Sequence, residues 1–203
     1  MRNHCLALGL ACAAPAVLAE DFPARYDVTT NNGRGYELRA APDASAPAIG
    51  QIPDDRQGLQ VVRLSEGGDW GLVTYGERSA WVAMAHLTRQ PAPQATALPM
   101  RCYGTEPFWG LNFPTGFFAE FERPEHPEEP FQIAGMAEST GSQGRIKAWS
   151  FISDASRATL TLRPEQCSDG MSDREFGLSA ILSIQENSGE MGLFLGCCSL
   201  TSP

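Results

Sequence analysis

One carboxylate in the second half of the chain lies in a stretch rich in turn and aromatic residues. Residues 101–110 read RCYGTEPFWG, and Glu106 precedes a Pro-Phe-Trp run. A carboxylate at the start of a strand can donate a proton, bind a cation or accept hydrogen bonds from a turn, and the last use is the commonest. Gly104 is expected to permit that turn. Phe108 and Trp109 are adjacent, so on a strand one faces the core and the other the barrel mouth or solvent.

A second cluster of polar residues lies in CSDGMSDREFG. Its candidate residues are Asp169, Ser172 and Asp173. The spacing is not that of a calcium-binding EF-hand loop, because the closing glutamate is absent. Short acidic and hydroxyl side chains cap tight turns, so we expect these residues to brace a turn.

This chain has few residues that could complete a hydrolytic mechanism with these candidates. A cysteine or serine nucleophile needs a histidine, and His126 lies in an acidic, proline-rich run, RPEHPEEP. The GxSxG motif of serine hydrolases is absent. A carboxylate pair such as Glu106 with Asp169 or Asp173 is the formal requirement of a glycosidase, but a small β domain leaves little room for a saccharide cleft. We therefore expect no catalytic residues.

The chain begins as exported proteins do. Residues 1–19, MRNHCLALGLACAAPAVLA, combine a basic residue, a short apolar run and a small-residue ending. This pattern predicts a signal peptide that is cleaved after Ala19. The alternative is lipid attachment at Cys12, although Gly9 stands where a lipobox has leucine. No later stretch reaches the ~20 apolar residues of a transmembrane helix, so we expect a periplasmic or secreted protein.

Cleavage would leave four cysteines: Cys102, Cys167, Cys197 and Cys198. In an oxidising compartment an even number predicts two disulfides, with three possible connectivities. Zinc binding by the four thiolates is the alternative, but the sequence has no CxxC pair. Cys197 and Cys198 are adjacent, so on a strand they face opposite sides and need different partners. We expect no metal and no cofactor.

The charge balance argues against two classes of partner. The chain has 15 Lys and Arg against 24 Asp and Glu, a net charge of -9. This charge repels phosphate backbones and anionic lipid, so we expect neither nucleic-acid binding nor electrostatic docking to membranes. Hydrophobic residues make up 42% of the chain, which is enough for a folded core.

A spacer rich in Pro, Ala and Gln divides the chain into two domains. Residues 89–99, RQPAPQATALP, show no apolar periodicity and are expected to form a semi-rigid linker between domains 26–88 and 100–203. Both domains show short alternating segments between Gly, Pro and Asp turn signals. This pattern predicts an all-β protein with a small N-terminal barrel, followed by a disulfide-braced antiparallel β-barrel or sandwich.

The first domain contains the segments YELRAAPDASAPAIGQIP and GDWGLVTYGERSAWVAMAHL. They resemble bacterial SH3-like (SH3b) domains, in which Arg-x-x-Pro, Ile-Gly, Gly-x-Trp and Trp-Val steps recur, although Ala80 stands where that family has glycine. The resemblance implies a small barrel that binds cell-wall peptides or protein partners. The expected ligand contacts are Asp69, Trp70, Tyr75, Arg78 and Trp81. Trp70 and Trp81 also fit a half-buried core.

The second domain resembles an uncharacterised family of exported bacterial proteins. The resemblance rests on Gly-x-Glu-Pro-Phe-Trp at 104–109, Cys-x-Asp-x-Met-Ser-Asp at 167–173 and Gly-Cys at 196–197. It implies a small β domain and specifies no activity. It also implies a bridge between Cys167 and Cys197, which leaves Cys102 for Cys198.

The sequence thus favours a non-catalytic binding protein of the cell envelope, with a cell-wall peptide or an envelope protein as partner. Two alternatives stay open. An inhibitor of a wall-degrading enzyme would present an acidic loop such as PEHPEEP to a cationic cleft. An unrecognised envelope hydrolase would use chemistry that the motifs do not specify. The sequence does not determine the oligomeric state.

Overall fold

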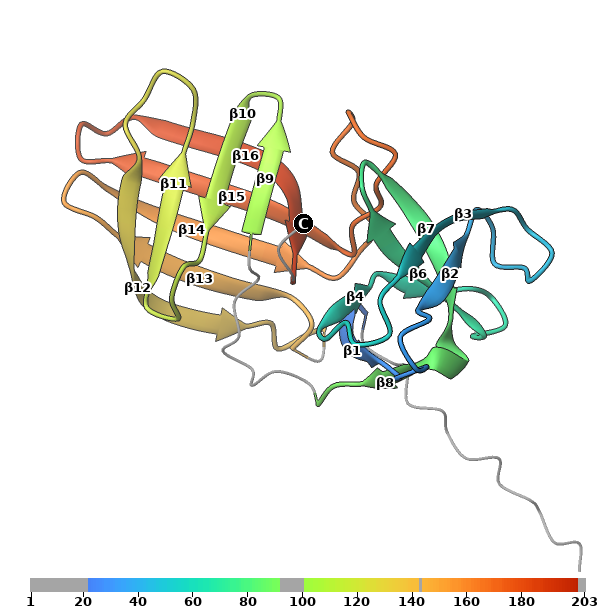
Figure 1. Cartoon of the computed structure of the whole chain (residues 1–203). Coiled ribbons are helices and arrows are strands. Elements are labelled where there is room, and N and C mark those ends of the chain that lie inside the picture. The colour runs from blue at the N-terminus through green and yellow to red at the C-terminus, as the bar shows by residue number, and fades with distance from the viewer. Residues whose placement is uncertain (1–21, 92–100, 143, 201–203) are drawn as a thin grey trace, which may run out of the picture.

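Two β units lie side by side in the molecule (Figure 1). The computed structural model describes residues 22–91, 101–142 and 144–200, so the predicted signal peptide and most of the predicted linker lie outside the described residues. The all-β prediction is confirmed, because the described residues form strands and one short 3-10 helix, η1 (Met84–His86). None of the helices in these ranges is long and apolar enough to cross a membrane.

The N-terminal unit consists of two small sheets around one core. Their strand orders are β4-β1-β8 and β3-β2-β7-β6-β5. The strands are β1 (Ala24–Val28), β2 (Tyr36–Arg39), β3 (Ala48–Ile52), β4 (Leu59–Val61), β5 (Arg63–Leu64), β6 (Trp70–Tyr75), β7 (Arg78–Ala83) and β8 (Leu87–Arg89). Strand β8 runs into the predicted linker, since Arg89 pairs with Tyr26 of β1. This unit holds no cysteine, so its core alone must stabilise it.

The segment LQVVRL is divided between the two sheets. Val61 ends β4 and lies in the main core of the N-terminal unit. Val62 instead packs with Leu72 and Trp81 on the other side of the larger sheet. The chain therefore passes from one sheet to the other here, and each valine covers a different face.

The C-terminal unit is a closed antiparallel barrel of eight strands in the order β10-β11-β12-β13-β14-β15-β16-β9. The strands are β9 (Arg101–Thr105), β10 (Phe108–Asn112), β11 (Phe118–Glu122), β12 (Glu129–Glu138), β13 (Lys147–Ile152), β14 (Ser156–Arg163), β15 (Leu178–Glu186) and β16 (Met191–Ser199). In β15 the alternation places Ala180, Leu182 and Ile184 inside. Apolar side chains from all eight strands fill the barrel, so its interior is a packed core rather than a pore.

Phe117 does not belong to the inward row of β11. It lies before the first residue of the strand and is 75% exposed. Ala119 and Phe121 are buried. The alternation of a strand does not extend past its last paired residue, so Phe117 is free to face solvent.

The structure contains both disulfides that the second resemblance implies. Cys102 of β9 is bonded to Cys198 of β16, with Cα atoms 4.0 Å apart, and Cys167 is bonded to Cys197, with Cα atoms 5.7 Å apart. Cys198 belongs to the barrel core, whereas its neighbour Cys197 turns to the other face and holds the segment between β14 and β15. The opposite directions of adjacent residues on a strand explain the pairing.

Gly104 has a different role from the one expected of it. It lies inside β9 and pairs with Trp109 of β10, rather than permitting a turn. A Cβ atom on Gly104 would stand 2.2 Å from both the indole Nε1 of Trp109 and the carbonyl oxygen of Leu195. The position is therefore glycine because the Trp109 indole crosses it and donates a 2.9 Å hydrogen bond to that carbonyl.

The segment between β14 and β15 (residues 164–177) joins the two units. In Figure 1 this orange segment reaches the green hairpin of β6 and β7. The backbone N–H of Asp173 donates to the Glu77 carbonyl at 3.0 Å, and the N–H of Ser79 donates to the Asp173 carbonyl at 3.1 Å. Arg63 forms an ion pair with Glu175 at 3.0 Å. The joining segment thus continues the N-terminal sheet, while the Cys167–Cys197 bond holds it to the barrel.

Candidate functional site

The five candidate residues of the N-terminal unit divide into packed and exposed groups. Trp81 is buried, and the Arg63 guanidinium lies 4.9 Å above its ring. Trp70 is half-buried and packs against the small cluster that contains Trp81. Both tryptophans therefore contribute to packing, the second role that the sequence allowed.

The other three candidates lie at or near the surface. Tyr75 is 38% exposed, and its ring covers Gly50, where a Cβ atom would stand 2.3 Å from it. Arg78 is exposed at the end of the hairpin, and its backbone bridges to Asp173. Asp69 is exposed, and its carbonyl accepts a hydrogen bond from the N–H of Met84. Tyr75 and Arg78 come together as partners across the β6–β7 hairpin.

The Glu-Pro-Phe-Trp motif forms the hairpin between β9 and β10. Glu106 and Pro107 occupy the turn, and their peptide bond is cis. Glu106 is exposed, while Phe108 is 53% exposed and Trp109 is buried. The expected division of the two aromatics between solvent and core is therefore what the structure shows.

The acidic cluster braces the joining segment, in line with its expected role at a turn. The Asp169 carboxylate accepts hydrogen bonds from the N–H groups of Met171 and Ser172, at 3.0 and 2.9 Å, and from the Ser172 hydroxyl at 2.8 Å. Burial acts to raise the pKa of Asp169, but these hydrogen bonds and the nearby Arg174 outweigh it and leave the pKa below its usual value. Asp173 contributes through its backbone, as described above.

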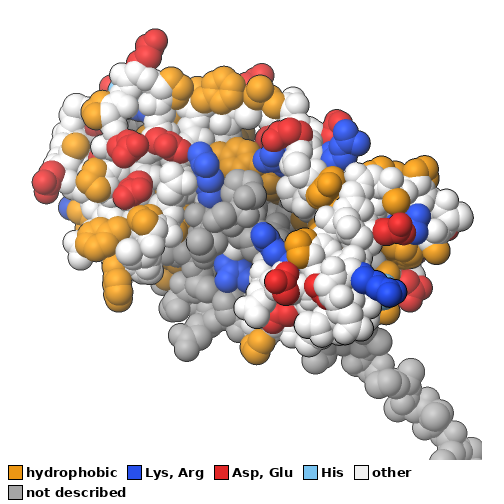
Figure 2. Space-filling view, in the orientation of Figure 1, with side chains coloured by type: hydrophobic (Ala, Val, Ile, Leu, Met, Phe, Trp, Pro, Cys, Tyr) orange, Lys and Arg blue, Asp and Glu red, His pale blue; other side chains and the backbone are white. Residues whose placement is uncertain are grey.

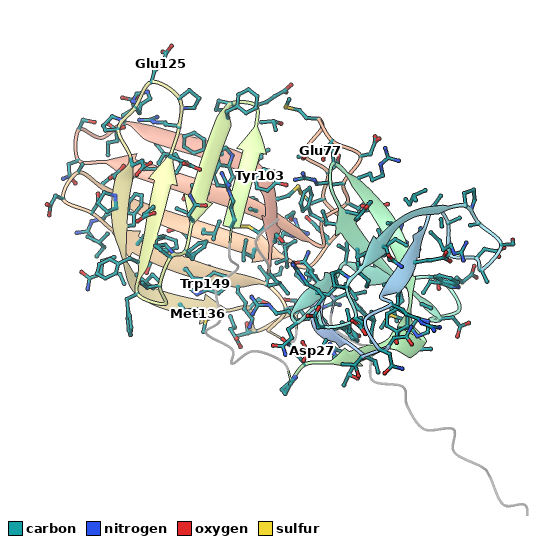
Figure 3. The ribbon with its side chains drawn as sticks, viewed as in Figure 1. Asp27, Glu77, Tyr103, Glu125, Met136 and Trp149 are labelled. Atoms are coloured by element: carbon teal, nitrogen blue, oxygen red, sulfur yellow. A yellow bond between two sulfur atoms is a disulfide. The ribbon has the colours of Figure 1, made fainter. Side chains whose placement is uncertain are left out.

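A pocket of about 570 Å³ lies on the outer face of β9, β10 and β11, a place that the sequence did not indicate. Its floor is Gly110, which is paired with Tyr103 on one side and with Glu122 on the other. A Cβ atom on Gly110 would stand 2.4 Å from the Glu122 carboxylate. The absent side chain therefore leaves a depression between these two residues. Figure 3 labels Tyr103 on the strand β9 that borders the pocket.

The pocket concentrates cations on an otherwise acidic protein. Its lining includes three arginines and a histidine against two carboxylates: Arg101, Arg123, His126 and Arg174, with Glu122 and Glu128. Figure 2 shows Lys and Arg side chains gathered near the middle of the visible face. We call this site the arginine pocket.

Ion pairs fix the arginines in place and neutralise them in part. Arg101 donates to the Glu122 carboxylate at 2.9 Å. Arg123 lies 3.6 Å from Glu186. Arg174 forms a pair with Glu77 across the junction and donates from Nε to the Gly76 carbonyl at 2.7 Å. The guanidinium groups are therefore held in place before any ligand arrives.

Two donors of the arginine pocket lack an acceptor. Among the described residues, the Tyr103 hydroxyl and the Nε of Arg101 are enclosed, and neither donates a hydrogen bond. Burial raises the pKa of the Tyr103 phenol, the Arg174 side chain lowers it as a donor to the phenol oxygen, and the nearby Asp169 raises it, with Arg101 opposing. The phenol thus keeps its proton at neutral pH and, like the guanidinium N–H, is a donor. Since buried donors are rarely left unpaired, the two atoms together indicate a place for acceptor oxygens.

A smaller cleft of about 160 Å³ continues from the arginine pocket into the junction. Arg101, Tyr103 and Arg174 line both spaces. The N-terminal unit adds Arg56 and Gln60 to the lining of the cleft. Tyr103 is held between the two spaces by an edge-to-face contact with Phe176, whose ring centre is 5.4 Å away.

Sequence reasoning missed Arg101, Tyr103, Arg123 and Arg174 as site residues and dismissed His126. One signal was present, because the alternation of RCYGT puts Arg101, Tyr103 and Thr105 on the face opposite Cys102 and Gly104. Arg174 could not be found in this way, since the joining segment that carries it has no periodic pattern. Within the described ranges, no group of three or more His, Cys, Asp or Glu is placed to hold a metal ion.

Comparisons of the chain with known protein families, with curated proteins and with solved structures found no match. The site must therefore be interpreted from its own chemistry.

Proposed function

We propose that this chain is an exported, non-catalytic binding protein of the bacterial envelope, and that the arginine pocket holds an anionic group of its ligand. The observation that carries the proposal is the pair of donors without acceptors, Tyr103 Oη and Arg101 Nε, in a pocket lined by three arginines. Enclosed donors favour a bound acceptor oxygen, and beside cations a carboxylate or a similar oxyanion gives the stronger, charge-assisted hydrogen bonds.

The envelope location rests on the signal-peptide pattern of residues 1–19 and on the two disulfides, which are typical of oxidising compartments. A cell-wall peptide fits both the pocket and the SH3-like resemblance, since such peptides carry free carboxylates. Tyr75 and Arg78, exposed on the N-terminal unit, are the contacts we propose for the rest of the ligand.

The test is calorimetric titration of the full mature chain with diacetyl-Lys-D-Ala-D-Ala and with its C-terminal amide. We expect the carboxylate form to bind and the amide to bind about tenfold more weakly, because a charge-assisted hydrogen bond is lost. Tyr103→Phe and Arg101→Gln should each weaken binding of the carboxylate form by a similar factor. Arg157→Gln, at an exposed arginine on β14 outside the pocket, is the matched control and should bind normally.

Four outcomes would contradict parts of the proposal. Equal binding of acid and amide would exclude the arginine pocket as the anion site. Loss of binding in Tyr75→Ala and Arg78→Ala alone would place the whole ligand site on the N-terminal unit. Cleavage of peptidoglycan by the protein would support a hydrolase, and protection of peptidoglycan from added lysozyme would support an inhibitor.

A further inference from the structure

The outer face of β16 carries a row of exposed apolar side chains. Met191, Leu193 and Leu195 alternate along the strand and are 68%, 65% and 62% exposed. Their neighbours Gly192, Phe194 and Gly196 point the other way, and Phe194 is buried in the barrel. Three large apolar residues in a row on the solvent side of a strand are uncommon on a monomeric protein and indicate an interaction surface.

At the Leu195 end of the row, residues from other segments add to the surface and enclose a groove. Ile181 of β15 is paired with Leu195. Phe108 of the β9–β10 hairpin and Met171 of the joining segment, 70% exposed, line the same space of about 730 Å³. We call the six residues Phe108, Met171, Ile181, Met191, Leu193 and Leu195 the β16 surface.

The edge of β16 beside this surface is open. Strand β9 pairs with β16 only at Cys197–Ser199, and its backbone at Tyr103 and Gly104 also lies against Leu195 and Gly196. No strand in the described ranges pairs with residues 191–194 on that side. The Leu195 carbonyl is satisfied by the Trp109 indole. An unpaired edge next to alternating apolar side chains is the arrangement that accepts an extended segment by strand addition.

The charges around the groove favour a cationic partner. Glu106, Glu165 and Asp169 line it, and its cation, Arg163, lies 3.5 Å from Glu165 and is neutralised by it. Glu190, exposed, precedes the first residue of the row. A second copy of this chain would bring the same acidic surroundings and a net charge of -9, and anionic lipid would be repelled for the same reason.

We propose that the β16 surface binds an extended segment of another protein in which apolar residues alternate with Lys or Arg. Main-chain groups of that segment pair with the open edge of residues 191–194. Its apolar side chains pack on Leu193, Leu195 and Phe108. Its Lys or Arg side chains alternate onto the other face of the added strand, and their positive charge complements the acidic residues around the groove and the net charge of -9. The site borders the arginine pocket at Phe108, which lines both spaces, and it does not depend on the function proposed for that pocket.

The test uses the full mature chain and the fluorescein-labelled peptide acetyl-KVKVKVK-amide in an anisotropy titration. We expect saturable binding that is at least ~tenfold weaker for the double variant Leu193→Ser/Leu195→Ser. Phe117→Ser is the matched control, because Phe117 is equally apolar and exposed but lies outside the surface; it should bind normally. The peptide EVEVEVE should not bind, and a KVKVKVK peptide with alternate backbone amides methylated should bind much more weakly.

Three results would overturn the proposal. The first is that KVKVKVK shows no saturable binding up to about 1 mM. The others are that the double variant binds KVKVKVK as tightly as the unmodified chain does, or that the acidic peptide binds as tightly as KVKVKVK. A dimer in light scattering that Leu195→Ser dissociates would show that a second copy occupies the surface. Binding to phosphatidylcholine vesicles that the double variant loses, without peptide binding, would assign it to a lipid surface. Because the substitutions are at exposed positions, circular dichroism should show an unchanged fold.

Discussion

The inner and outer faces of the wall formed by β9, β10 and β16 use the same residue types for different purposes. Cys198 closes the barrel core, whereas Cys197 holds the joining segment. Gly104 makes room inside for Trp109, whereas Gly110 makes room outside for Glu122. The inner residue of each pair fits a fixed, close-packed volume. The outer residue places a second segment against the barrel.

This contrast gives a rule for the effects of substitutions. Changes on the inner face must disturb a packed core and should lower the free energy of unfolding. Changes on the outer face should alter the arginine pocket, the junction or the β16 surface, with a smaller effect on the barrel itself. The following predictions test this rule, from the largest expected effect to the smallest.

Removal of the inner disulfide should have the largest effect. Replacing Cys102 and Cys198 by alanine frees a loop whose ends are 96 residues apart. The chain-entropy relation gives a loss of roughly 4 to 5 kcal/mol in the free energy of unfolding. Urea titration followed by tryptophan fluorescence measures it. A loss under about 1 kcal/mol would show that packing, not the covalent bond, closes the barrel.

Removal of the outer disulfide should loosen the junction as well as lower stability. The Cys167–Cys197 bond closes a segment with a separation of 30 residues, so its loss should cost roughly 3 to 4 kcal/mol by the same relation. Hydrogen exchange should become faster at Asp173 and Ser79, whose backbones pair across the junction. Unchanged exchange at these amides in the Cys167→Ala/Cys197→Ala variant would mean that the N-terminal sheet alone orders the joining segment.

The two glycines provide a direct comparison of the faces. Gly104→Ala should destabilise the barrel by roughly 2 kcal/mol, because its Cβ meets the Leu195 backbone and the enclosed Trp109 ring. Gly110→Ala meets the side chain of Glu122, which can move away, so the loss should be under about 0.5 kcal/mol. Thermal unfolding of both variants measures the difference. Equal destabilisation would contradict the division into a rigid inner and an adaptable outer face.

The smallest effect should be a pH dependence at the joining segment. The pKa of Asp169 is lower in the folded protein than its usual value of 3.8. Ionised Asp169 therefore stabilises the fold above that value, and the contribution is lost as the pH falls through the lowered pKa. Asp169→Asn should flatten the acid limb of stability against pH as the pH falls from 3.8 through the lowered pKa. Asp54→Asn is the comparison in the N-terminal unit. The N–H groups of Asn31 and Gly33 lower the pKa of Asp54, so this variant should flatten the acid limb in the same direction. If the free energy of unfolding of Asp169→Asn changed with pH as steeply as that of the unmodified chain, this role of Asp169 would be contradicted.

Strand alternation made much of the barrel predictable. It put Phe108 and Trp109 on opposite faces and gave Cys197 and Cys198 different partners. These are local properties, because each strand residue takes its direction from its neighbours along the chain.

The arginine pocket and the junction were not predictable in this way. The pocket needs Arg174 beside Arg101 and Tyr103, and the segment that carries Arg174 is placed by backbone pairing with another unit. Main-chain hydrogen bonds leave no signature in side-chain type. The glycine positions were ambiguous for a related reason, since a glycine that makes room for a distant ring cannot be told from a glycine in a turn until that ring is placed.

The bond between the first and last strands of the barrel also changes what a protease can do to it. With Cys102 joined to Cys198, the chain from β9 to β16 is a covalent ring. A single cut in any loop of this ring, such as the exposed tip near Glu125 in Figure 3, opens the ring without releasing a fragment. The eight strands then remain on one connected molecule with their hydrogen bonds in place. A barrel built in this way can be nicked and still remain assembled, which suits a protein that is exported among proteases.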